Sequence, residues 1–154
     1  GWDEIADGPV AGHGSSGLDT PLTRALLREE AVAFLGPDWP VVSYDDRTYR
    51  AWCRSSLERL VADAHGLMVM RRGVSPLVLQ AARLAQGAAT GRVFSKSEAG
   101  ETATSLVPIH VRRILNDAVG YRNGANTSMY WGPFERKYDA LRLLRELAAA
   151  VADQ

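Results

Sequence analysis

Apolar residues recur at helical spacing in several stretches that glycine or proline separates, and this pattern predicts a mostly α-helical chain. A first helix is expected over 21–35, where the Gly36-Pro37 pair would end it. A second helix is expected to begin after Asp45 or Asp46, because either carboxylate suits an N-cap, and to end before Gly66. The apolar residues of this second helix form one stripe, so it is expected to be the core helix.

The middle of the chain predicts one more helix and a loop. The third helix is expected over 75–86, after a turn at 71–73, and Gly87 would end it. Residues 87–100 are rich in glycine, serine and alanine, which is typical of a loop. Within that loop the Val93-Phe94 pair is the expected anchor to the core.

The last third of the chain predicts further helices and a small hairpin. A short helix is expected around 101–106, and a longer one from Pro108 until Gly120. The Asn123-Gly124 pair favours a type I′ turn, so we expect a small β-hairpin near 121–131. The final helix begins at Pro133. The predicted fold class is therefore mostly α, with five or six helices.

Length and composition predict one domain with an arm. A chain of 154 residues has the usual size of a single domain, which we place at 19–154. Residues 1–18 contain five glycines and read as a flexible arm. The longest apolar runs, such as 67–70, are too short to span a bilayer, so no membrane is expected. A single cysteine, Cys53, and the absence of a signal-like N-terminus favour a cytoplasmic protein.

Charge is unevenly distributed although the net charge is zero. Residues 1–50 carry nine acidic and four basic side chains, which leaves +5 on the remainder. The excess lies in 71–113, so a basic face is expected there. Arginine outnumbers lysine 16 to 2, which suits phosphate or carboxylate recognition but also follows from a GC-rich genome.

The order of elements over 75–132 is that of a winged helix-turn-helix, and the segment Ser105–Asn116 loosely resembles a recognition helix. The leading functional hypothesis is therefore a non-enzymatic nucleic-acid-binding or regulatory module, with DNA or RNA as partner. The expected contact residues are basic or polar: Lys96, His110, Arg112, Arg113, Arg122 and Asn123. The alternative interpretation of this segment is an amphipathic helix with a solvated basic face.

A second hypothesis is a structural or protein-interaction subunit of a homo- or hetero-oligomeric assembly. Aromatic residues gather near the C-terminal helix, and such residues either form interface hot spots or cover the edge of a core. The expected interface residues are Tyr121, Tyr130, Trp131, Phe134 and Tyr138.

Catalytic interpretations are weaker. Arg59 and His65 have a spacing similar to the Arg-x4-6-His pattern of a helical RNase superfamily, but a histidine near a helix end also suits the helix dipole. The glycines of 12–17 lack the strand and Gly-Lys-Ser/Thr of a phosphate loop, and Cys53 has no nucleophile-like setting. Helix capping explains the Asp45-Asp46 pair. We expect no catalytic residues, no metal and no cofactor.

Overall fold

The computed structural model describes residues 45–66 and 70–152. Five α-helices lie in this part of the chain, and three short 3-10 turns connect them. The α-helices are α2 (Asp46–Asp63), α3 (Arg71–Thr90), α4 (Lys96–Thr102), α5 (Arg112–Arg122) and α6 (Pro133–Ala152). The mostly α class is confirmed. The predicted arm at 1–18 and helix at 21–35 lie outside the described residues.

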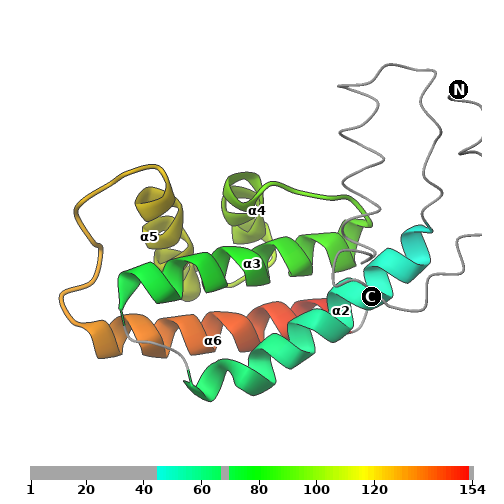
Figure 1. Cartoon of the computed structure of the whole chain (residues 1–154), viewed down its shortest axis with the longest axis horizontal. Coiled ribbons are helices and arrows are strands. Elements are labelled where there is room, and N and C mark those ends of the chain that lie inside the picture. Colours follow the sequence, from blue (N-terminus) through cyan, green and yellow to red (C-terminus); the bar gives the residue numbers. More distant parts are fainter. Residues whose placement is uncertain (1–44, 67–69, 153–154) are drawn as a thin grey trace, which may run out of the picture.

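Helix α3 is the centre of the arrangement (Figure 1). It packs against each of the other four α-helices, with α4 and α5 on one side and α2 and α6 on the other. Its buried side chains are mostly small or β-branched, and Ala81, Ala82 and Ala85 are fully buried. Small side chains let neighbouring helices approach closely, which explains how one helix contacts four others.

Helix α2 begins directly after Asp45, one of the two N-cap residues predicted from the sequence. The carboxylate of Asp45 accepts hydrogen bonds from the backbone N–H groups of Arg47 and Thr48 at 3.2 and 3.0 Å. A hydrogen bond from the Thr48 hydroxyl and these two amides lower the pKa of Asp45 below its usual 3.8. Tyr49, Cys53 and Leu57 lie at intervals of four along α2 and are buried. The helical spacing of apolar residues predicted for this helix is therefore confirmed.

Helix α3 is longer than predicted at both ends. The expected turn at 71–73 is its first turn, and the helix passes through Gly87. A Cβ atom at Gly87 would lie 2.7 Å from the Cys53 Sγ and 3.0 Å from the Tyr49 hydroxyl. Gly87 therefore permits the close approach of α2 and does not end the helix. Gly91 ends it instead, with a φ of 74° that favours glycine.

The loop predicted over 87–100 is partly wrong. Val93 and Phe94 are buried, as expected of an anchor. Helix α4 nonetheless begins at Lys96, because Ser95 and Glu98 form a capping box that the composition of the segment obscures. The helix expected around 101–106 is thus the end of α4 and a following 3-10 turn at Ala103–Ser105.

The hairpin predicted near 121–131 is wrong, since none of its residues forms a strand. A type I′ turn needs positive φ at both central residues. Gly124 has a φ of 87°, but Asn123 has a φ of −83° because it caps the end of α5, which continues past Gly120 to Arg122. Residues 123–132 form a loop, and α6 follows from Pro133 as predicted. In the part of the chain described here, no helix is both long and apolar enough to cross a membrane.

Candidate functional site

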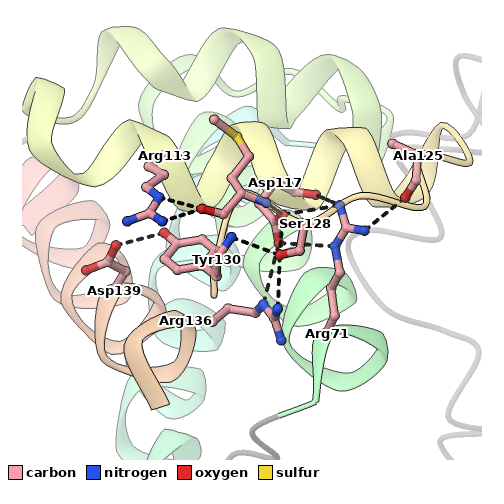
Figure 2. Close-up of polar contacts among 9 residues, drawn as sticks. Arg71, Arg113, Asp117, Ala125, Ser128, Tyr130, Arg136 and Asp139 are labelled. Atoms are coloured by element: carbon pink, nitrogen blue, oxygen red, sulfur yellow. Dashed lines mark hydrogen bonds and ion pairs between the residues drawn. The ribbon is translucent and has the colours of Figure 1, made fainter. Parts of the chain in front are cut away.

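A buried carboxylate on α5 holds the loop that precedes α6 (Figure 2). Asp117 is fully buried and its oxygens lie 3.2 Å from the Arg71 guanidinium and 3.6 Å from the Arg136 Nε. It also accepts hydrogen bonds from the Ser128 hydroxyl at 3.0 Å and the Met129 backbone N–H at 2.8 Å. One carboxylate thus connects α3, α5, α6 and the loop.

The two arginines extend this connection. Arg71 donates to the backbone carbonyl of Ala125 at 2.9 Å, and Arg136 donates to the Ser128 hydroxyl at 3.0 Å. Ionised partners make these hydrogen bonds stronger than neutral ones. The loop is therefore fixed near both of its ends.

Tyr130 adds apolar packing to the contacts around Asp117. Its ring is buried beneath the Arg113 guanidinium, which lies 4.1 Å from the ring centroid. Its hydroxyl donates to Asp139 at 2.7 Å. Burial, together with this hydrogen bond, raises the pKa of Tyr130 well above its usual value. Tyr130 therefore belongs to the core. Its burial does not support the interface role predicted from the sequence.

Arg113 is fully engaged within the molecule. Its guanidinium donates to Glu135 at 2.6 Å. It also donates to the backbone carbonyl of Met129 (Figure 2). The hydrogen bond that Arg113 donates to Glu135 raises the pKa of Arg113. Arg112 donates to the Val107 carbonyl at 3.3 Å. Both arginines were expected to contact nucleic acid. Instead, Arg112 binds the backbone just before the 3-10 turn that precedes α5, and Arg113 connects α5 to the loop and to α6.

The remaining predicted nucleic-acid contacts fall into two places. His110 is exposed on the 3-10 turn that precedes α5. Lys96 and Arg122 line one pocket at the opposite end of α5, and Asn123 is exposed next to them. The structure therefore brings together Lys96, Arg122 and Asn123 and places His110 apart.

Three of the predicted interface residues are strongly exposed. Trp131 is 100 % exposed, Phe134 76 % and Tyr138 66 %. Tyr121 is exposed at 38 % and lies under the Arg71 guanidinium, 5.0 Å from its ring centroid. Exposed aromatic side chains in a group are unusual on the surface of a monomer and mark binding surfaces.

Phe134 and Tyr138 belong to a continuous exposed face of α6. The face continues along the helix at intervals of three or four through Arg142, Arg145 and Ala149, which are also exposed. We call these five residues the α6 stripe. It begins with two aromatic residues, and Arg142 and Arg145 make the following part basic. The opposite face, including Leu143, Leu144 and Leu147, is buried.

A hollow of about 440 Å³ lies within the α6 stripe. It is lined by Tyr138, Leu141, Arg142, Arg145 and Glu146. The sequence shows the basic residues of the last helix, but it does not show that they border a hollow beside exposed aromatic rings.

The sequence interpretation missed Asp117, Arg71 and Arg136 as a connected group. The available signal was a single acidic residue three positions after Ile114 and directly before Ala118, both of which are buried. A buried acidic residue requires a cationic partner. The packing of α3 and α6 against α5 provides two such partners, Arg71 and Arg136.

The described residues show no contact that supports a catalytic role for Arg59 or Cys53. Arg59 is exposed and donates to the Ser56 hydroxyl at 3.2 Å on its own helix. The side chain of His65 and the glycines of 12–17 lie outside the described part. Cys53 is buried, and desolvation raises the pKa of its thiol to about 11. Among the described side chains, no cluster of three His, Cys, Asp or Glu residues suits a metal ion.

Comparisons with family models, with curated proteins and with solved structures each found no match.

Proposed function

We propose that this chain is a protein-interaction subunit that pairs with a second copy of itself through the α6 stripe. The observation that carries the proposal is the exposure of Phe134 and Tyr138, one helical turn apart, at the end of a hollow that Tyr138 lines. A two-fold symmetric interface uses the same patch on both subunits, so the patch must be complementary to itself. A protruding ring and a hollow on one helix face meet this requirement.

The antiparallel arrangement of two α6 helices places each half of the stripe against the other half. Phe134 and Arg145 lie roughly 16 Å apart along the helix axis, at 1.5 Å per residue. When Phe134 of one copy is placed opposite Arg145 of the second, its ring reaches the hollow of the second copy. The two-fold axis then passes between Tyr138 and Leu141.

This register also pairs charge with aromatic surface. Phe134 and Tyr138 of one copy face Arg145 and Arg142 of the other, which allows cation–π contacts. The same arrangement avoids placing Arg142 directly against its own copy, where like charges would repel. The parallel arrangement would bring arginines together and leave the hollow unfilled, so the stripe favours antiparallel pairing.

Sedimentation velocity over a range of concentrations tests the proposal. We expect the mass to rise from 16.8 kDa toward twice that value as concentration increases. The double variant Phe134→Ala/Tyr138→Ala should weaken association by at least about 30-fold, since hot-spot aromatics each contribute roughly 1–2 kcal/mol or more. Tyr121→Ala, an exposed tyrosine outside the stripe, is the matched control and should associate like the unchanged protein. A monomer at all concentrations, or equal loss in both variants, would contradict the proposal.

A second candidate function is nucleic-acid binding through Lys96, Arg122 and Asn123. It is favoured by the proximity of Lys96 and Arg122, neither of which forms an ion pair with any described residue. A filter-binding titration with duplex DNA and single-stranded RNA at low salt tests it. Binding that weakens as salt increases, and weakens further in Lys96→Gln/Arg122→Gln, is the expected result. Absence of binding at low salt would exclude this candidate.

A further inference from the structure

A pocket of about 430 Å³ lies beside the start of α3 and the end of α5. Its volume falls within the range of small-molecule sites, which is roughly 300–1,000 Å³. Residues from α3, α4, α5 and the following loop line it: Ser75, Pro76, Leu79, Lys96, Ala118, Tyr121, Arg122, Gly124, Ala125 and Asn126. None of them belongs to the α6 stripe.

Ser75 gives the pocket a polar group without a partner. The residue is 1 % exposed, and its hydroxyl makes no hydrogen bond with any described residue. A serine inside a helix commonly donates to the carbonyl four residues earlier, which is that of Arg71 here. A buried hydroxyl that forgoes this bond carries a desolvation cost, which a bound polar atom would remove.

Two cations lie at the pocket. Arg122 donates through its Nε to the Ser97 hydroxyl at 3.0 Å, which leaves the terminal nitrogens of the guanidinium for another acceptor. Lys96 forms no ion pair with a described residue. The nearby acid Glu98 is turned to the N-terminus of α4, where it accepts from the Ser95 backbone N–H. The pocket therefore combines two positive charges with no acidic lining residue.

The rest of the lining is apolar. Leu79 and Ala118 are buried at the wall, and Pro76 and Tyr121 complete it. The Tyr121 ring is fixed by the Arg71 guanidinium 5.0 Å from its centroid, and Asp117 in turn fixes Arg71. An apolar wall with few polar groups, placed together, is typical of a site that binds an organic molecule in one orientation.

We infer that this pocket binds a small organic anion, with its carboxylate or phosphate group between Lys96 and Arg122 and its apolar body against Leu79 and Tyr121. The Ser75 hydroxyl donates a hydrogen bond to the bound molecule. The two anionic groups share the chemistry that recognises them, and the planar guanidinium of Arg122 can pair with either through two parallel hydrogen bonds.

An NMR titration of the full chain tests the inference, with phenyl phosphate, benzoate and the neutral benzyl alcohol as probes. We expect saturable shifts of backbone amides at 75, 77–79, 96–97 and 121–126 with at least one of the two anions, and none with benzyl alcohol. Phenyl phosphate and benzoate together distinguish a phosphate site from a carboxylate site. Inorganic phosphate should bind more weakly than phenyl phosphate because it lacks the apolar body.

Three variants make the test specific. Lys96→Met/Arg122→Met should weaken binding by at least about tenfold, since hydrogen bonds to charged groups contribute roughly 1.5–3 kcal/mol. Arg72→Met, which removes an exposed charge outside the pocket, should leave it unchanged. Ser75→Ala should weaken it by roughly threefold to tenfold without lowering the stability of the fold, because the hydroxyl forms no hydrogen bond with a described residue.

Three results would overturn the inference. The first is the absence of saturable shifts with both anions. The second is an equal loss of binding in Arg72→Met, which would indicate general attraction to positive charge. The third is unchanged anion binding in Ser75→Ala. Because Ser75 is buried, that variant would leave nucleic-acid binding through Lys96 and Arg122 intact, so the two proposals fail separately.

Discussion

Asp117 shows how one residue can determine the shape of a surface that it does not itself reach. Its carboxylate holds Arg71, Arg136 and the loop that carries Trp131. Burying one carboxylate is costly unless cations and hydrogen-bond donors surround it, and here two arginines and two donors do so. The exposed Trp131 is thus presented from a fixed loop.

The variant Asp117→Ala should lower the free energy of unfolding by about 3 kcal/mol, because it leaves two largely buried guanidinium groups without a counter-charge. Urea denaturation followed by circular dichroism measures the change. Asn116→Ala, at the exposed neighbouring position on the same helix, should change stability by less than about 0.5 kcal/mol. A loss below about 1 kcal/mol in Asp117→Ala would show that the ion pairs are not important for the fold.

Gly100 is a second residue whose role depends on packing. A Cβ atom there would lie 2.6 Å from both the Leu79 Cδ2 and the Val119 Cγ2, so α3, α4 and α5 meet at this position. Gly100→Ala should destabilise the fold by about 1 kcal/mol, since overpacking exceeds the gain in helix propensity. The same denaturation experiment on Gly66→Ala is the control, because no heavy atom lies within 4 Å of the added Cβ. Equal stability of the two variants would contradict this account of the packing.

At the scale of elements, the sequence predicts best where the signal is local. The start of α2 at Asp45 and the start of α6 at Pro133 depend on capping chemistry and on the fixed φ of proline, and both predictions are confirmed. Glycines were misinterpreted because their role depends on distant neighbours. Gly87 accommodates α2, and Gly120 lies inside α5, although both were expected to end a helix.

The sequence predicts which residue types form the candidate site, but it does not predict which of them are exposed or paired. The aromatic residues at the start of α6 were identified from the sequence, and Trp131, Phe134 and Tyr138 are exposed. Tyr130 is buried and Arg113 is bound to Glu135, because the loop returns onto α5 and α6. No local pattern shows which guanidinium meets an acid from another helix, so free and engaged arginines look alike in the sequence.

The cap of α2 predicts a pH dependence. Two amides and the Thr48 hydroxyl lower the pKa of Asp45 in the folded state, so the ionised carboxylate stabilises the fold above the unfolded pKa near 3.8. This contribution is lost as pH falls through the lowered folded pKa. Asp45→Asn keeps a capping side chain without a charge. Its urea midpoint should be below that of the unchanged protein at pH 6, and the difference should shrink at pH 3. A difference that is independent of pH would contradict the role of the ionised cap.

At the scale of the whole molecule, the central helix α3 separates two surfaces. The pocket lies where α3 meets α4 and α5, and the α6 stripe lies on the helix packed against the other side of α3 (Figure 1). The two surfaces share no residue, so a ligand and a second copy of the chain can be bound together.

The most direct test of the account measures the register of the two α6 helices by cross-linking with a short bis-maleimide. In the antiparallel register, Arg142→Cys lies roughly 8 Å along the axis from its own copy, whereas Ala149→Cys lies roughly 28 Å away, at 1.5 Å per residue. Native Cys53 is buried, and the raised pKa of its thiol, about 11, keeps it protonated and unreactive at neutral pH. We predict a cross-linked dimer for Arg142→Cys and none for Ala149→Cys. Equal cross-linking of the two variants, or none in either, would contradict pairing through the α6 stripe.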